Sequence, residues 1–345
     1  MRKKRKNNNI LKFLTIIIIL IILGMLYVRT LKSPVDKNDT SKIEVQIDDG
    51  TSSIKIAKIL KSHNLIKNDK YFLYYAKTNN LSNLKSGVYE FSKSQSLEEI
   101  LKSLNTGGRP IGEKVTIKEG YSIKQIAELL EEKGLVNKEF FIELTENKAN
   151  FSDKFTFLQD ESIQSLEGFM YPETYFIPKG TPETEIISMF LSQTQKIFDE
   201  NSVLSNINDI NPNIQNLNNL ITLASIVEKE SADNSERDII AGIFINRLTN
   251  SIPLQSCVTV EYVLGIHKQR LSYEDTQVQS PYNTYINAGL PPTPICTPTI
   301  SSINAVKNYK RTDYLFFVAK QDGSHVFSRT YDEHLKATKD IYGEY

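Results

Sequence analysis

One apolar segment near the N-terminus constrains this 345-residue chain more than any other feature. Ile10–Val28 is apolar except for Lys12 and Thr15. At ~1.5 Å per residue, a helix of this length nearly spans the ~30 Å hydrocarbon core of a bilayer. A helix in a soluble core would carry a polar stripe, which is missing here, and Gly24–Arg29 has no small-x-small site for signal cleavage. We therefore expect an uncleaved transmembrane helix over residues 10–28.

The charges around this segment predict its orientation. Residues 2–6 are all basic, whereas only Arg29 and Lys32 follow closely, so the N-terminus is expected in the cytoplasm and everything after about residue 29 outside. The whole chain has 41 basic and 41 acidic residues, which argues against a nucleic-acid partner. Export permits a disulfide, and the two cysteines, Cys257 and Cys296, either pair with each other or remain packed thiols.

A gapless internal repeat follows the segment 29–43, which has the composition of a stalk. Residues 50–60 match residues 120–130, and each copy begins with a short alternating strand, 45–47 or 115–117. An acidic-Gly turn and a serine suited to capping a helix come next. Apolar residues at 56, 57 and 60, and again at 126, 127 and 130, give each predicted helix one buried stripe.

This strand–turn–cap–helix unit resembles the LysM module, which binds the amino sugars of peptidoglycan or chitin. The alternative is a generic small α+β unit that serves as a spacer. The predicted organisation is a basic cytoplasmic tail (1–9), a transmembrane helix (10–28), a stalk (29–43), a first LysM-like module (44–110), a second one (111–155) and a mixed α+β domain (156–345). The expected fold class is therefore α+β.

The last of these segments has its own pattern of elements. Residues 168–178 are aromatic and broken by prolines, which is typical of a loop or short strand that lines a site. Residues 249–299 read as loop or strand-like. Helices are predicted over 183–200, 220–229, 236–248 and 301–307 and from about 330, with a buried strand at 314–319 and its hairpin partner at 325–327.

The helix over 220–229 leads from an almost purely apolar run into Glu228, Lys229 and Glu230. Such a helix usually belongs to the core. A carboxyl group at its end loses solvation, which favours the neutral form that can donate a proton. Helical periodicity does not choose between the two glutamates, and the alternative is that both lie at the solvated end of a core helix.

An ordered series of motifs surrounds these glutamates and resembles the MltG (YceG-like) endolytic murein transglycosylases. The order of an anchor, a LysM-like region and this domain is similar as well. The motifs are Gly168–Phe176, Ala224–Glu230, Glu236–Asp238, Phe244–Leu248, Leu254–Ser256, Tyr282–Tyr285 and Gly289–Pro292.

The resemblance implies that Glu228 is the catalytic acid, because it holds the place of the first Glu in Ser-Ile-Val-Glu-Lys-Glu. Glu228 would protonate the oxygen between N-acetylmuramic acid and N-acetylglucosamine and then act as base on the C6 hydroxyl. That hydroxyl closes onto C1 and gives a 1,6-anhydro end without consuming water. The implied substrate is peptidoglycan glycan strands, the implied neighbours are glycan-synthesising penicillin-binding proteins, and no metal or cofactor is needed.

Other polar side chains in the motifs are expected to bind the sugar. Tyr282 and Tyr285 can stack on sugar faces. Arg247 either meets a lactyl or peptide carboxylate or, like Arg237, forms an ion pair with Glu236 or Asp238. Glu230 tunes Glu228 or orients the helix. The residues expected to donate hydrogen bonds to N-acetyl and hydroxyl groups are Asn246, Gln255 and Asn283.

Two departures from the family pattern involve the cysteines. Cys257-Val258 stands where many members have Asp-Pro, and Cys296 stands where a small residue is more usual. A Cys257–Cys296 bridge is one way to hold this loop. A different reading of the whole chain is a wall-binding scaffold of the elongation or division machinery with weak or no catalysis.

Overall fold

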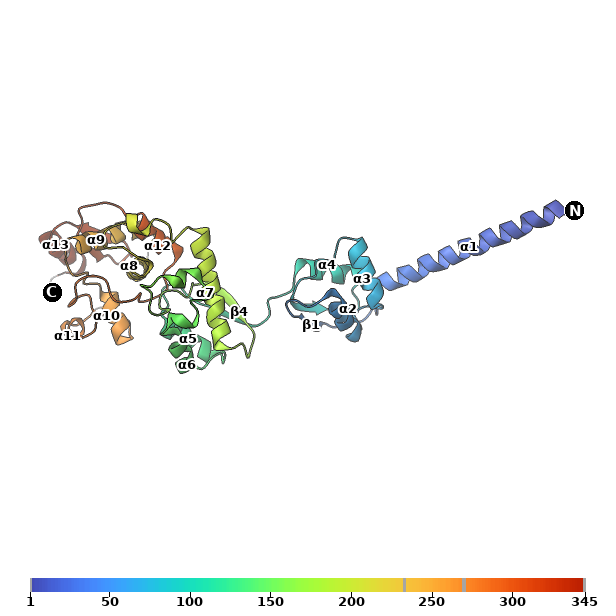
Figure 1. Cartoon of the computed structure of the whole chain (residues 1–345), viewed down its shortest axis with the longest axis horizontal. Coiled ribbons are helices and arrows are strands. Elements are labelled where there is room, and N and C mark those ends of the chain that lie inside the picture. The colour runs from blue at the N-terminus through green and yellow to red at the C-terminus, as the bar shows by residue number, and fades with distance from the viewer. Residues whose placement is uncertain (1, 232–233, 269–270, 344–345) are drawn as a thin grey trace. The chain divides into compact units, whose positions relative to one another are not determined.

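The computed structural model describes residues 2–231, 234–268 and 271–343 (Figure 1). The chain divides into two compact units, Met1–Gly112 and Glu113–Tyr345. This boundary falls at the predicted start of the second module, but residues 113–155 share one continuous core with the residues that follow them. The mixed α+β class is confirmed.

The first unit carries the apolar helix and one copy of the repeat. Its helix Phe13–Lys32 is long and apolar enough to cross a membrane, and it is not buried against the rest of the chain. Strands β1 and β2 form an antiparallel pair, and Ser52 caps α2 as expected. The elements are α1 (Arg2–Lys32), β1 (Ile43–Ile47), α2 (Ser53–Ser62), α3 (Asp69–Thr78), β2 (Gly87–Phe91) and α4 (Leu97–Thr106).

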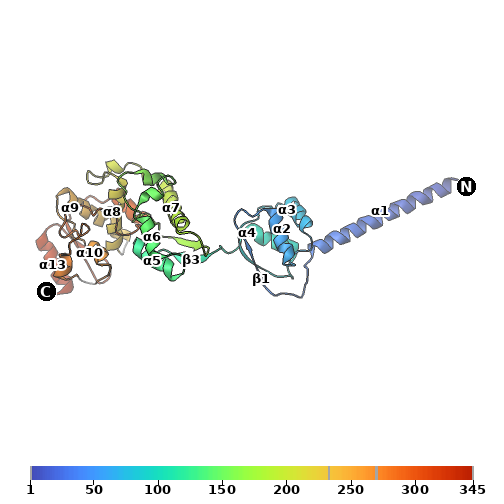
Figure 2. The same cartoon turned by 60° about the horizontal axis from the view of Figure 1, so that its bottom comes forward.

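The second copy of the repeat has the same order of elements, but its closing strand comes from far along the chain. Strand β3 (Glu113–Thr116) is followed by α5 (Ile123–Glu132) and α6 (Lys138–Thr145). Its antiparallel partner is β4 (Thr174–Ile177), in the segment that was expected to be a loop or short strand (Figure 2). An unpaired strand edge exposes backbone groups, so β3 needs this partner. The second copy therefore closes at residue 177, well past the predicted limit of 155.

The remaining elements are mainly helical, and most follow the predicted boundaries. Strand β5 is half-buried and not buried as predicted. The region 249–299 contains two helices that the sequence did not predict, α10 and α11. The elements are α7 (Glu183–Glu200), α8 (Leu217–Glu230), α9 (Arg237–Thr249), α10 (Cys257–Leu264), α11 (Tyr273–Thr276), α12 (Ile300–Lys307), β5 (Phe316–Ala319), β6 (His325–Ser328) and α13 (Tyr331–Tyr342), with short 3-10 helices at Lys148–Asn150, Thr156–Gln159, Ile207–Asp209 and Asn234–Glu236.

Helix α8 is the central element of the larger unit. It packs against α9, α10 and α12, and its residues 220–228 are all buried. The side chain of Asn216 caps its N-terminus by accepting a hydrogen bond from the Asn219 backbone. This burial fixes the C-terminal turn, and with it the directions of Glu228 and Glu230.

Candidate active site

Glu228 is held in a closed network inside the protein. Arg237 Nη2 donates to its Oε1 at 3.0 Å, and the Thr299 backbone N–H and hydroxyl donate to its Oε2 at 2.8 and 2.7 Å. Arg237 Nη1 also donates to Thr299 Oγ1, at 3.0 Å. Only 3% of the Glu228 side chain and 7% of the Arg237 side chain are exposed. Both carboxylate oxygens of Glu228 are therefore taken up by donors and shielded from a substrate.

Thr299 also begins the next helix. Its hydroxyl accepts from the Ser302 backbone and so caps α12, which begins at Ile300, one residue before the predicted start. One threonine thus ties the start of α12 to the end of α8. This arrangement is typical of a structural ion pair that joins three helices.

Glu230 lies two residues further along α8 and has different surroundings. Two residues correspond to a rotation of about 200° around a helix, so the two carboxylates point in nearly opposite directions. Glu230 is half-buried and accepts a hydrogen bond from the hydroxyl of Ser256, the residue before α10. Burial raises the pKa of Glu230, the Ser256 hydrogen bond opposes that shift, and the charge of His325 opposes it further.

Ser256 belongs to a small buried network of hydroxyl groups and is the member that contacts Glu230. Its backbone N–H donates to Thr284 Oγ1 at 3.0 Å, and its carbonyl accepts from Thr259 Oγ1 at 2.7 Å. Thr259 and Thr284 are themselves 2.9 Å apart through their hydroxyl oxygens. These bonds fix the backbone from which the Ser256 hydroxyl reaches Glu230.

Most of the polar residues predicted to bind sugar make hydrogen bonds within the protein. Asn246 donates to the carbonyls of Thr312 and Tyr314, and the buried Asn283 donates to those of Thr276 and Val278. The groups that engage Arg247 are the carbonyls of Pro253 and Leu315, at 2.9 and 3.0 Å, and the side-chain oxygen of Gln255.

The two predicted aromatic residues and the two cysteines lie nearby. Tyr285 Oη lies 3.0 Å from Cys257 Sγ, and Tyr282 Oη lies 2.7 Å from Thr293 Oγ1. Both cysteines are free: Cys257 is exposed, whereas Cys296 is buried and donates to the carbonyl of Ser225. Of the two alternatives that the sequence left open, a bridge or unpaired thiols, the structure has unpaired thiols, each in a contact of its own.

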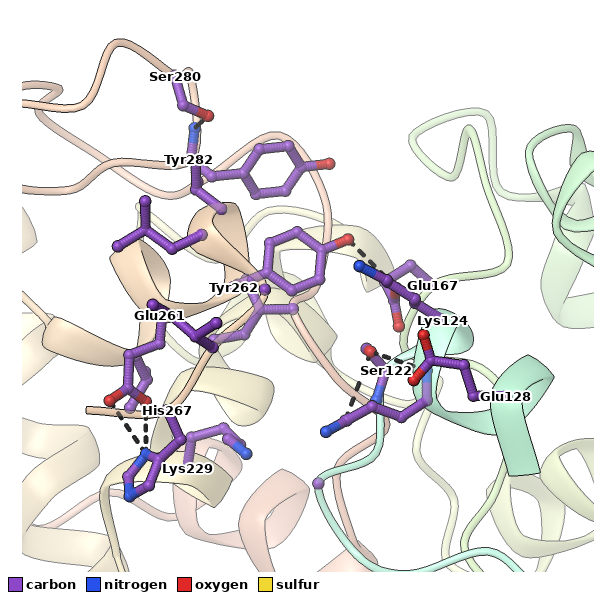
Figure 3. Close-up of a pocket in the computed structure, with 18 residues that line it drawn as sticks. Ser122, Lys124, Glu128, Glu167, Lys229, Glu261, Tyr262, His267, Ser280 and Tyr282 are labelled. Atoms are coloured by element: carbon purple, nitrogen blue, oxygen red, sulfur yellow. Dashed lines mark hydrogen bonds and ion pairs between the residues drawn. The ribbon is translucent and has the colours of Figure 1, made fainter. Parts of the chain in front are cut away.

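A cavity of about 590 Å³ lies beside the end of α8 (Figure 3). Side chains from α5 form one side of it, and Glu261 and Tyr262 of α10 form the other. Lys229, between the two glutamates, also lines it, as does Tyr282. The sequence analysis placed α5 in a separate LysM-like module and therefore did not connect it with the site around the two glutamates.

The wall of the cavity contains a buried carboxyl group, Glu167. It accepts a hydrogen bond from the Ile123 backbone at 3.0 Å. It accepts another from the Tyr262 hydroxyl at 3.2 Å (Figure 3). Burial raises the pKa of Glu167 to about 7, although these hydrogen bonds act in the opposite direction. Glu167 therefore links the start of α5 to α10 across the cavity.

Comparisons of this chain with a family model and with individual known proteins point to the same family. The model of the YceG-like family matches residues 45–340. A protein of Bacillus subtilis (strain 168) named endolytic murein transglycosylase is 34% identical over 91% of this chain and 89% of its own length. One of the same name from Streptococcus pneumoniae (strain D39) is 32% identical over 90% of this chain and 60% of its own length.

A solved structure extends the agreement to the fold. The crystal structure of a YceG-like protein from Listeria monocytogenes is 33% identical in sequence and superposes with a TM-score of 0.58. It covers 86% of this chain and 99% of its own. The family match spans both units and includes the two glutamates, the cavity and the network around Thr299. The chain therefore belongs to the YceG-like family.

Proposed function

We propose that this protein is a membrane-anchored endolytic murein lytic transglycosylase and that Glu230 is its general acid. The relatives that share about a third of its residues are named for this activity. We choose Glu230 because the two glutamates differ in their hydrogen-bond partners and in their exposure. Glu228 has both oxygens occupied and is shielded, whereas Glu230 is half-buried and has one described hydrogen bond, from Ser256.

The position of Glu230 suits a group that must give up and then recover a proton. Burial raises its pKa, so the protonated form persists at a higher pH than in an ordinary glutamate. Glu230 is also the last residue of α8, where the negative end of the helix dipole disfavours a carboxylate. The expectation from the sequence was Glu228, and the structure favours Glu230 because Glu228 is committed to Arg237 and Thr299.

The lytic transglycosylase reaction needs a single carboxyl group that acts first as acid and then as base. Glu230 gives its proton to the glycosidic oxygen between N-acetylmuramic acid and N-acetylglucosamine as the bond from that oxygen to C1 breaks. The resulting carboxylate takes the proton of the muramic acid C6 hydroxyl, whose oxygen forms a bond to C1. The product ends in 1,6-anhydro-muramic acid, and Glu230 is protonated again. A glycosidase that hydrolyses the bond would usually need a second carboxylate at a set distance.

The N-terminal helix supports attachment to the membrane. Its apolar side chains are exposed, as expected for a helix surrounded by lipid and not for one in a protein core. The basic residues 2–6 favour a cytoplasmic N-terminus, so the larger unit would work on the outer face, where nascent glycan strands emerge.

Two glutamine variants test the proposal in the full-length protein in detergent. Murein digested by each protein is analysed by mass spectrometry for 1,6-anhydro ends. We expect them from wild type, a loss of about 10²–10⁴-fold with Glu230→Gln, and a much smaller loss per folded molecule with Glu228→Gln. The reverse pattern would restore Glu228 as the acid. Reducing ends from wild type would indicate a hydrolase, and no products at all would favour the scaffold reading.

A further inference from the structure

We propose that the cavity between α5, α8 and α10 binds the anionic peptide of the murein strand, through Lys124 and Lys229. This inference rests on the proposed function, because the cavity adjoins the proposed acid. The muramic acid of a strand carries a lactyl group, and the short peptide attached there has free carboxylates. A cavity of about 590 Å³ is within the usual range for a ligand site.

The acidic groups of the cavity already have partners. Glu128 pairs with Lys138 at 2.9 Å, outside the cavity lining. Glu261 accepts from His267 Nδ1 and from the Lys268 backbone, at 3.0 and 2.9 Å. Glu167 is bonded to Ile123 and Tyr262, as described above. None of these carboxyl groups needs a cation from a ligand.

The two lysines of the cavity are in the opposite situation. Within the described parts of the chain, neither the Lys124 nor the Lys229 ammonium group has a hydrogen bond or an ion pair, and both side chains are exposed. Lys124 comes from α5 and Lys229 from α8, so the two approach the cavity from different elements (Figure 3). The cavity therefore offers two uncommitted positive charges, which select an anionic ligand.

Two glycines make room for these lysines. Gly120 has φ +72°, and a Cβ there would lie 3.2 Å from Lys229 Cδ. Gly265 has φ +68°, and a Cβ there would lie 3.4 Å from Lys124 Nζ. Positive φ values strain other residues, so glycine suits both positions on backbone grounds as well. The side chains of both lysines thus lie against backbone that carries no side chain of its own.

The cavity is also next to the acid. Lys229 precedes Glu230 in the chain, and Ser256, which contacts Glu230, immediately precedes α10. Val258, Glu261 and Tyr262 of α10 then line the cavity. A muramic acid held with its C1 at Glu230 can therefore extend its lactyl group along α10. Arg247, the residue expected to meet a carboxylate, is buried and is not part of the cavity lining, and each of its three nitrogens already donates one hydrogen bond within the protein.

The test compares murein strands that keep their peptides with strands stripped by an amidase. We expect full-length wild type to cleave the peptide-bearing strands faster. In Lys124→Gln/Lys229→Gln, this preference in kcat/KM should fall about tenfold, since two ion pairs of exposed lysines are lost and each contributes a few-fold. Lys154→Gln is the matched control, because Lys154 is an exposed lysine of the same unit that does not line the cavity.

A binding measurement separates this inference from the proposed function. N-acetylmuramoyl-L-alanyl-D-glutamate has no glycosidic bond to cleave, and its dissociation constant from the double variant should be about tenfold weaker than from wild type. If the double variant makes anhydro ends with unchanged preference and binds this ligand as wild type does, the cavity is not the peptide site and the enzyme assignment stands. If wild type makes no anhydro ends but its binding still depends on the lysines, the proposed function fails and the cavity assignment survives.

Discussion

Removing Arg237 should destabilise the larger unit strongly, because it leaves the Glu228 carboxylate buried without its counter-charge. The two side chains are 3% and 7% exposed, so water cannot replace the lost partner. Breaking a buried ion pair from one side typically costs about 3–5 kcal/mol. Two donors from Thr299 remain on Glu228 in the variant, at 2.8 and 2.7 Å, which favours the lower part of that range.

The magnitude can be measured with a double-mutant cycle. For a unit of 150–250 residues, each kcal/mol shifts Tm by about 2–4 °C, so Arg237→Met should lower Tm by roughly 6–15 °C. Glu228→Met should have a similar effect, because it leaves the buried Arg237 guanidinium without its counter-charge. The double variant should be more stable than either single variant, because two apolar side chains can replace a buried ion pair at little cost. Calorimetry of the full-length protein in detergent follows the transition of this unit.

The structural role of the Arg237–Glu228 ion pair can be tested against a control variant. Arg311→Met removes an exposed arginine of the same unit and should leave Tm nearly unchanged. Additive effects in the cycle would show that Arg237 and Glu228 are not coupled. If Arg237→Met left Tm unchanged but abolished cleavage of murein, Glu228 would be part of the chemistry and the structural role assigned to the pair would be wrong.

Three further changes have predictable effects. Burial raises the pKa of Glu167 from 4.5 to about 7, so its neutral form stabilises the folded protein. This contribution to the free energy of unfolding is complete below pH ~4.5 and is lost as the pH rises through ~7, a change of about 3 kcal/mol. Thermal melts of Glu167→Gln should lack this pH dependence. Ser256→Ala removes a hydrogen bond that lowers the pKa of Glu230, so the alkaline limb of kcat/KM should move to higher pH in a rate profile. Gly168→Ala should cost about 2–4 kcal/mol in unfolding measurements, because Gly168 has φ +89° and a Cβ would lie 2.5 Å from that of Pro294.

Local patterns predicted most elements of this fold. Ser52 and Ser122 cap helices as expected, and the apolar stripes of both repeat copies are buried. Helix α7 has the predicted bounds, because its apolar spacing and flanking breakers are local signals. Helix α10 was missed, since Cys257–Leu264 is rich in β-branched residues and has no helical stripe of its own. Its place is set by packing against α8.

The roles of the two glutamates could not be predicted from their own segment. Glu228 and Glu230 lie on the same helix end and differ only in direction. What distinguishes them is Arg237, which is nine residues from Glu228, Thr299, which is 71 residues from it, and Ser256, which is 26 residues from Glu230. The internal hydrogen bonds of the predicted sugar-binding residues could not be foreseen from the sequence for a related reason. Asn246 and Asn283 bind backbone carbonyls that become neighbours only in the folded chain.

The second repeat copy is therefore part of the proposed active site and not a separate module. Besides β4, two backbone hydrogen bonds join it to the segment before α12: Gly120 donates to Thr297 at 3.2 Å, and Thr297 donates to Tyr121 at 2.9 Å. Thr297 is two residues from Thr299, which holds Glu228. The turn that places Gly120 against Lys229 is thus bonded to the segment 297–299, which also holds the end of α8 through Thr299. The first copy has its own core, whereas the second supplies one side of the cavity, so a repeat that looks uniform in sequence is used in two different ways.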